Sequence, residues 1–253
     1  MLSFIDTAVA RRFRKKWSRA EKSLNEIDLS SLHELHAEAT QTQARLDSFI
    51  KKAKERLFAP ELGSSADIFP EDADWAWRPE AWRWPWDRVG FVSAKNGQRA
   101  SDEVTLFHDC PLAELTLSQH RNRRGGDISP YRVELGIFGF EGDFLSLVID
   151  LENKALHGLS KEHIFRLECD LKQEGEAKVM TRLNVRCGPN VERVVREVDL
   201  TDALYCVEFD LAYTELNEDR VEAAWLDIIF SNPAMNRIVL SDLTLSRRYR
   251  SPL

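Results

Sequence analysis

The sequence predicts a mainly β protein, an antiparallel β-sandwich of the jelly-roll type preceded by an N-terminal helical hairpin or coiled-coil arm. From residue 88 onward, about ten short runs of β-branched and aromatic residues are separated by turn residues. Residues 1–59 contain neither Gly nor Pro, and their apolar residues recur every three or four positions, as in amphipathic helices. We therefore divide the chain into a helical arm (1–59), a linker with a Trp-rich strap (60–87) and a β-sandwich domain (88–253).

The composition is that of an ordinary globular protein, with an uneven distribution of charge. The formal net charge of −7 argues against nucleic acid as a partner. Residues 1–60 nevertheless hold 12 Lys and Arg against 8 Asp and Glu, whereas the rest of the chain holds 23 against 34. No window approaches the ~18 consecutive apolar residues of a membrane span, and the N-terminus lacks the order of a secretory signal. We therefore expect a cytoplasmic protein.

Residues 1–24 are predicted to form an amphipathic helix with a basic surface. Its apolar stripe comprises Leu2, Ile5, Val9, Phe13 and Trp17. The basic residues on the remaining circumference are Arg11, Arg12, Arg14, Lys15, Lys16, Arg19 and Lys22. Such a helix can lie on an anionic membrane surface, which would place the protein at the inner face of the membrane. It can equally pack against its own chain or a protein partner, and both interpretations stay open.

A second helix is predicted to begin between Asp28 and Ser31. Ser31 followed by Glu34 has the spacing of a capping box. The apolar positions follow a rough heptad: Leu32, Leu35, Ala39, Thr42, Leu46, Phe49, Ala53 and Leu57. This stripe needs a partner, which is either the first helix in an antiparallel hairpin or a second copy of the chain in a homo-oligomer.

Five of the seven tryptophans lie between residues 75 and 86, interleaved with Arg78, Arg83, Pro79 and Pro85. One interpretation is an exposed stacking platform, because Trp82, Trp84 and Trp86 would share one side of an extended chain. The other interpretation is a buried strap that pins the helices to the sheet. We favour the strap, because a cytoplasmic protein rarely leaves five indoles exposed.

Near the C-terminus, residues 223–230 and 237–248 flank a short loop of Ser, Asn and Pro, a composition typical of an antiparallel hairpin. Within the first run Ala224, Leu226, Ile228 and Phe230 occupy one face, and Trp225 and Asp227 occupy the other.

Residues 179–187 alternate in the same way and place three polar side chains on one face. The predicted ligand-binding set is Trp225, Asp227, Arg182, Asn184 and Arg186. Arginine and aspartate can bind hydroxyls or anionic groups in paired geometry, and an indole can stack on an apolar ring face. The alternative is a solvated sheet face with cross-strand ion pairs.

The run from Trp225 to Phe230, the loop after it and the run from Ile238 to Arg248 resemble the closing strands of jelly-roll carbohydrate-binding modules. The whole chain also resembles an uncharacterised bacterial family of unknown function. The first resemblance implies a non-catalytic sandwich that binds a glycan on one sheet face.

Catalytic signatures are absent from the sequence: there is no nucleophile elbow, P-loop, dinucleotide fingerprint or H-E-x-x-H motif. His108, Asp109 and Cys110 are consecutive, and neighbours on a strand point in opposite directions. His33 and His36 lack a third metal ligand nearby. We therefore expect no enzyme, cofactor or metal, although a glycosidase on such a frame stays open because its two acids can be distant in sequence.

Two hypotheses of function follow. The first is a binding module that recognises a glycan or similar polar ligand on one sheet face. The alternative is an interaction or assembly protein that docks a membrane surface or a protein partner through residues 1–24 and the second helix, with the sandwich as scaffold.

Overall fold

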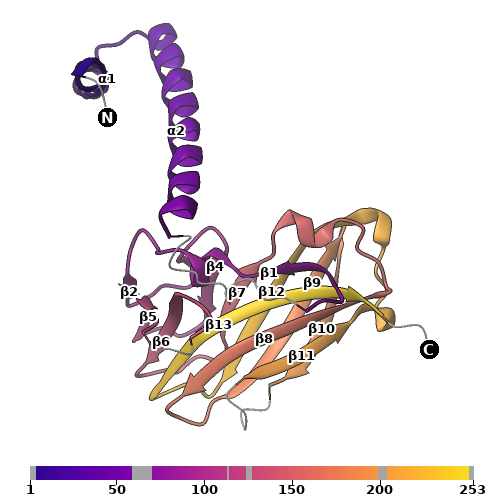
Figure 1. The fold of residues 1–253 in the computed structure, drawn as a ribbon. Helices are drawn as coiled ribbons and strands as arrows, with labels where there is room; N and C mark the ends of the chain where they lie inside the picture. The colour runs from indigo at the N-terminus through magenta and orange to yellow at the C-terminus, as the bar shows by residue number, and fades with distance from the viewer. Residues whose placement is uncertain (1–3, 59–69, 113, 124–126, 199–203, 251–253) are drawn as a thin grey trace. The chain divides into compact units, whose positions relative to one another are not determined.

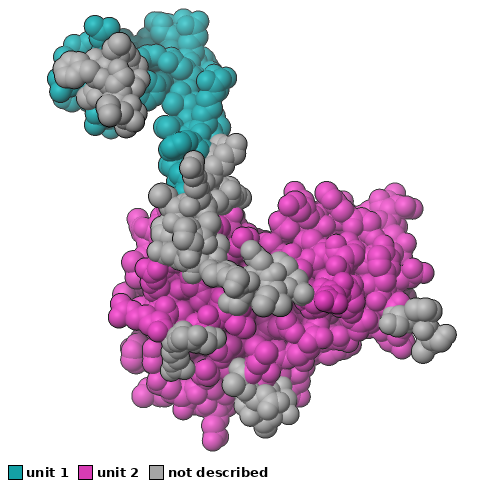
Figure 2. All heavy atoms as spheres, in the orientation of Figure 1, with its two compact units in different colours: residues 1–57 teal, residues 58–253 magenta. Residues whose placement is uncertain are grey.

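The computed structural model describes residues 4–58, 70–112, 114–123, 127–198 and 204–250. The chain forms two compact units, Met1–Leu57 and Phe58–Leu253 (Figure 2). The first unit contains only helices in its described part, and the second contains both β-sheets (Figure 1). The predicted division into a helical segment followed by a mainly β domain is therefore confirmed.

The helical unit consists of α1 (Phe4–Lys22) and α2 (Leu29–Phe58). The Asp28 carboxylate caps α2, because it accepts hydrogen bonds from the Ser31 backbone N–H (3.0 Å) and the Ser30 hydroxyl (2.6 Å). These hydrogen bonds, that of Ser30 first, lower the pKa of Asp28. The predicted capping box is wrong, because Ser31 already lies inside the helix when Asp28 takes the N-cap position.

The two helices meet through a small set of side chains. The Lys16 ammonium donates to the Glu38 carboxylate (2.6 Å), while Phe13 and Trp17 contact one another edge to face on the side of α1 that meets α2. In Figure 1 α1 is seen nearly along its axis and α2 from the side, so the helices cross steeply. Of the predicted apolar stripes, the side chains of Leu2, Ile5, Val9 and Leu57 lie outside the described part.

Two antiparallel sheets pack face to face in the second unit (Figure 1). The seven-stranded sheet has the order β11 (Tyr205–Asp210), β8 (His163–Gln173), β13 (Asn236–Tyr249), β6 (Tyr131–Ile137), β5 (Leu115–Arg121), β2 (Gly90–Val92), with β1 (Ala73–Trp77) also paired to β13. The six-stranded sheet has the order β10 (Asn190–Glu197), β9 (Lys178–Cys187), β12 (Val221–Ser231), β7 (Leu145–Asp150), β4 (Val104–His108), β3 (Gln98–Arg99). The predicted antiparallel sandwich is thus confirmed.

The core lies between the two sheets, because every long strand alternates apolar and polar residues and turns its apolar face inward. Fully buried members include Leu147, Leu183 and Leu226 from one sheet and Leu135 and Leu167 from the other. Three of the four cysteines are buried and all four are free thiols. Burial raises the pKa of Cys169 to about 12, as expected for an inert structural thiol.

The predicted C-terminal hairpin is wrong, because β12 and β13 belong to different sheets. β12 pairs with β9 and β7, whereas β13 pairs with β8, β6 and β1. The connection between β12 and β13 crosses from one layer to the other and contains two non-glycine residues with positive φ, Asn232 and Met235. Alternation shows which face of a strand is buried but not which neighbour supplies its hydrogen bonds, and here both strands bury their apolar faces in the same core from opposite sides.

The Trp-rich segment is part of the sandwich, which therefore begins at Ala73 among the described residues. β1 runs antiparallel to β13, with Trp75 opposite Arg247 and Trp77 opposite Leu245. After Pro79 the chain forms the single-turn helix α3 (Glu80–Arg83). The short 3₁₀ segments η2 (Asn153–Leu156), η3 (Leu211–Tyr213) and η4 (Glu218–Arg220) complete the fold.

Candidate functional site

The five predicted ligand-binding residues lie together on the outer face of the six-stranded sheet. In the β9–β12 pair, Trp225 is opposite Asn184 and Asp227 is opposite Arg182. Residues directly opposite in an antiparallel pair share a face, and Leu226, between the two β12 positions, is buried in the core. Trp225, Asp227, Arg182 and Asn184 therefore all point away from the core.

Asp227 is the centre of a hydrogen-bonded cluster. Although it lies on the outer face, its exposed fraction is only 3%. Its Oδ2 atom accepts from Arg182 Nε (2.7 Å) and Asn184 Nδ2 (3.0 Å), and lies 2.5 Å from Arg182 Nη2. The Asn184 amide also donates to the backbone carbonyl of Arg182 (3.1 Å). These charge-assisted contacts neutralise Arg182 and hold all three side chains in one geometry.

Trp225 lies beside this cluster and is half-buried. The Arg186 guanidinium carbon is 5.5 Å from the centre of the Trp225 ring, a cation–π contact. Arg186 is exposed and makes no ion pair within the described part of the chain. Its guanidinium group therefore covers one face of the indole without being held by an ion pair among the described residues.

Two further residues extend the site, and sequence reasoning missed both. Asp150 on β7 lies opposite Trp225, and Arg193 on β10 lies opposite Asn184. A row of four side chains thus crosses four neighbouring strands. Partial desolvation raises the pKa of Asp150, although the residue reaches solvent and the Arg99 charge acts in the opposite direction. No sequence signal could have found this row, because the register between β12 and β7 is set only in the folded chain.

An apolar area with one unpaired hydroxyl lies next to the row on the same face. Ser146 of β7 is opposite Ile229 of β12 and Phe107 of β4. The Ser146 hydroxyl is buried and has no hydrogen-bond partner among the described residues. The outer face therefore offers an indole, paired polar groups and an apolar margin, the combination that ligand sites use.

The predicted stacking platform of Trp82, Trp84 and Trp86 does not form. Trp82 is 0% exposed and its Nε1 donates to the Leu240 carbonyl (3.0 Å). The chain is helical at Trp82, so the three indoles do not alternate along an extended strand. Trp84 and Trp86 are half-buried, with the Arg83 guanidinium 5.4 Å from the Trp84 ring.

The segment is instead a strap buried against the seven-stranded sheet. Gln119 of β5 holds it with a single side chain: Nε2 donates to the carbonyls of Ala81 (2.7 Å) and Trp84 (2.8 Å), and Oε1 accepts from the Trp86 N–H (2.7 Å). Arg78 adds a buried ion pair to Asp242 of β13 (2.9 Å). These contacts attach the segment to the seven-stranded sheet, as the strap interpretation expects.

The other candidate sites contain no converging chemistry. The His108 ring bonds the Ala94 carbonyl (2.9 Å), the Asp109 carboxylate accepts from the Phe144 N–H (3.1 Å) and Cys110 Sγ contacts Leu112 O (3.1 Å). Among the described residues, no group of three or more His, Cys, Asp or Glu side chains could hold a metal ion. In the same part of the chain, no helix is both long and apolar enough to cross a membrane.

Solved structures with similar strand arrangements include carbohydrate-binding modules. The family 11 carbohydrate-binding module from Clostridium thermocellum, solved with a beta-1,3-1,4-mixed-linked tetrasaccharide, is 11% identical with a TM-score of 0.40, covering 62% of this chain and 96% of that one. The xylan-binding domain from Paenibacillus barcinonensis is 9% identical with a TM-score of 0.36, covering 65% and 95%.

A domain of a bacteriophage CBA120 tailspike protein is 8% identical with a TM-score of 0.40. The match covers 62% of this chain and 21% of the tailspike chain. None of these similarities identifies a ligand of this chain. No curated protein matches the sequence. Over residues 1–253, however, the sequence matches a family of unknown function, DUF6478, and the chain belongs to that family.

Proposed function

We propose that the outer face of the six-stranded sheet binds a glycan or a similarly polar ligand, with Trp225 as the stacking residue. The observation that carries this proposal is the buried Asp227–Arg182–Asn184 cluster beside the half-buried indole. A merely solvated sheet face gains little from surface ion pairs and has no need to bury a carboxylate. A face that binds hydroxyl groups benefits from donors and acceptors that are already fixed in position.

Each group has a role that follows from its chemistry. The Trp225 ring stacks on the apolar face of a sugar ring once Arg186 moves aside. Arg182 has spare N–H donors on its guanidinium group, whereas both N–H groups of the Asn184 amide are already engaged. Asp150 is the acceptor on the other side of the indole. Arg186 and Arg193 make no ion pair among the described residues, so near Trp225 these two cations outnumber the one carboxylate that lies opposite it, Asp150. We therefore expect an acidic glycan to bind more tightly than a neutral one.

We expect this face to bind without hydrolysing. The Asp227 carboxylate is ion-paired and accepts several donors at one oxygen, which leaves it unsuited to proton donation. Partial burial raises the pKa of Asp150, but hydrolysis needs a second carboxylate across the scissile bond.

Isothermal titration calorimetry of the full-length protein with neutral and with uronic-acid oligosaccharides measures the affinities and tests the proposal. Trp225→Ala should weaken binding at least about tenfold, because the stacking surface is lost. Arg186→Ala should weaken the acidic ligands more than the neutral ones. Trp84→Ala, which removes a half-buried indole of the strap, is the control and should leave affinity unchanged. Binding that survives Trp225→Ala, or an absence of binding across the whole set, would overturn the proposal.

A further inference from the structure

One side of α1 carries cations without counter-charges. Five exposed basic residues of α1 make no ion pair in the described part of the chain: Arg11, Arg12, Lys15, Arg19 and Lys22. At about 100° per residue, all five fall within an arc of roughly 100° around the helix axis. Glu21, the one acidic residue of α1 whose side chain is described, lies outside that arc. We call these five residues the cationic arc.

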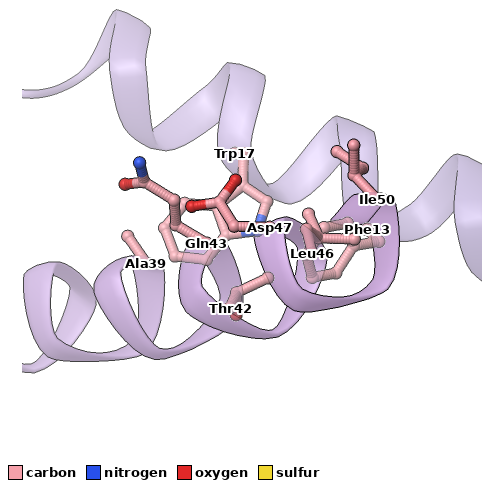
Figure 3. A pocket seen from close by; sticks show the side chains of 8 residues that line it. All are labelled: Phe13, Trp17, Ala39, Thr42, Gln43, Leu46, Asp47 and Ile50. Atoms are coloured by element: carbon pink, nitrogen blue, oxygen red, sulfur yellow. The ribbon is translucent and has the colours of Figure 1, made fainter. Parts of the chain in front are cut away.

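The cationic arc is the side of α1 that α2 leaves free. Phe13 and Trp17 project from the opposite side and line a hollow of about 330 Å³ with Ala39, Thr42, Leu46 and Ile50 of α2 (Figure 3). Lys16, at the edge of the contact, is paired with Glu38 and is not part of the arc. Packing of the aromatic side chains against α2 thus fixes which side of α1 faces outward, and that side is basic.

The helical unit also exposes apolar side chains. The exposed fractions are 40% for Phe13, 51% for Leu46 and 47% for Ile50, and Phe49 is exposed as well. Because the helices cross, α1 covers only part of the α2 stripe. The helical unit thus combines a basic surface on α1 with exposed Phe, Leu and Ile side chains, most of them on α2. Elements that lie at a membrane interface have this composition.

We propose that the helical unit binds the surface of a bilayer containing anionic phospholipids, with the cationic arc on the lipid headgroups. A row of cations on a straight helix matches the plane of negative charge that such a bilayer presents. Nucleic acid fits less well, because the formal net charge of the chain is −7 and the exposed aliphatic side chains would gain no partner on a nucleic acid. The arc of a second copy does not fit against this arc, because the contact would bring like charges together.

Co-sedimentation of the full-length protein with vesicles tests this proposal. One kind of vesicle consists of phosphatidylcholine alone. The other contains phosphatidylcholine with about 30% phosphatidylserine, which supplies the anionic headgroups. We expect binding only to the anionic vesicles and its loss at high salt, because the attraction is screened. The triple variant Arg11→Gln, Lys15→Gln, Lys22→Gln should lower the partition coefficient about 100-fold, since each basic residue contributes roughly a factor of five.

A matched control variant shows whether the loss of binding depends on where the three positive charges are removed or only on the change in net charge. Lys154→Gln, Lys161→Gln and Lys178→Gln remove the same net charge from exposed positions of the sandwich unit, and this variant should bind as the wild type does. Circular dichroism of the arc variant checks that its helices remain. The proposal would be overturned if the protein bound both kinds of vesicle equally or neither kind. It would also be overturned if the control variant lost as much binding as the arc variant, or if the wild type but not the arc variant bound a DNA duplex in place of the vesicles.

Discussion

The Trp-rich strap and the outer face around Trp225 both place tryptophans beside arginines, and the fold uses them in opposite ways. In the strap, the indole N–H of Trp75 donates to Glu152 Oε1 (3.0 Å) and that of Trp82 to the Leu240 carbonyl (3.0 Å). Both rings are part of the core. Trp225, by contrast, is half-buried with an exposed arginine over its face.

The difference teaches that the pairing of Trp with Arg in a sequence does not by itself distinguish an anchor from a binding surface. A buried indole with a satisfied N–H contributes its whole surface to stability. An indole covered only by a mobile side chain can exchange that cover for a ligand. The deciding property is burial, and burial depends on the layer into which the side chain points.

The largest effect expected from this comparison is on stability. Trp82→Ala removes a fully buried ring and its hydrogen bond, and should lower the free energy of unfolding by about 3–5 kcal/mol. Trp225→Ala is the matched substitution on the outer face and should cost about 1 kcal/mol or less. Urea unfolding of the full chain measures both.

Similar losses in the two variants would mean that the Trp225 indole is structural too, and the contrast between the regions would fail. A Trp82→Ala variant that is insoluble can be replaced by Trp82→Phe, which keeps an aromatic ring but removes the N–H donor and part of the ring volume. That variant should still lose more stability than Trp225→Phe.

A smaller loss of stability is expected when the Gln119 side chain, which holds the strap to β5, is replaced. Gln119→Leu keeps the approximate shape of the side chain but leaves the Ala81 and Trp84 carbonyls and the Trp86 N–H without their partner. Unpaired buried groups of this kind should destabilise the fold by roughly 2–3 kcal/mol. Gln98→Leu, whose side chain bonds only the neighbouring Arg99 carbonyl, is the control. A null effect of Gln119→Leu would show that the strap is held by its indoles alone.

The smallest effect is a dependence of stability on pH at the junction of strap and sheet. His163 is fully buried, its Nδ1 accepts from the Ser160 N–H (3.1 Å) and its Nε2 is 3.5 Å from Asp74 Oδ2. Burial, and then the nearby Arg247 charge, lowers the pKa of His163 despite the attraction of Asp74. The unfolded chain therefore takes up a proton near pH ~6.5, while the folded chain does not.

The melting temperature should consequently fall as the pH is lowered from about 6.5 toward the depressed folded-state pKa, and the stabilisation should be complete above ~6.5. His163→Gln should flatten this part of the profile, whereas His157→Gln, at an exposed position, should not. Partial burial opposes ionisation of Asp74, but its hydrogen bonds and charge contact with Arg247 outweigh burial and lower its pKa, so its own contribution is lost only below about pH 4. A profile unchanged by His163→Gln would refute the assignment.

Much of the candidate site could be predicted from the sequence, because it depends on alternation within single strands. Arg182, Asn184 and Arg186 share a face by their spacing, and so do Trp225 and Asp227. That the two groups would meet required β9 and β12 to be neighbours, and the structure places them side by side. Asp150 and Arg193 were missed because they enter through pairings with β7 and β10 that leave no local pattern.

The sequence by itself determined most of the element types, the inward and outward faces of the strands and the basic character of the first helix, because each follows from local periodicity. The single-turn helix α3 at Trp82 is an exception. Only the tertiary structure decided that β12 and β13 lie in opposite sheets and that Trp82 is buried while Trp225 is not, whereas the choice of Asp28 over Ser31 as the cap of α2 is local. The first two depend on which distant segments pair and pack, and hydrophobic burial, the main driving force, is not directional. Hydrogen-bond register then selects one arrangement among the many that the same alternating pattern allows.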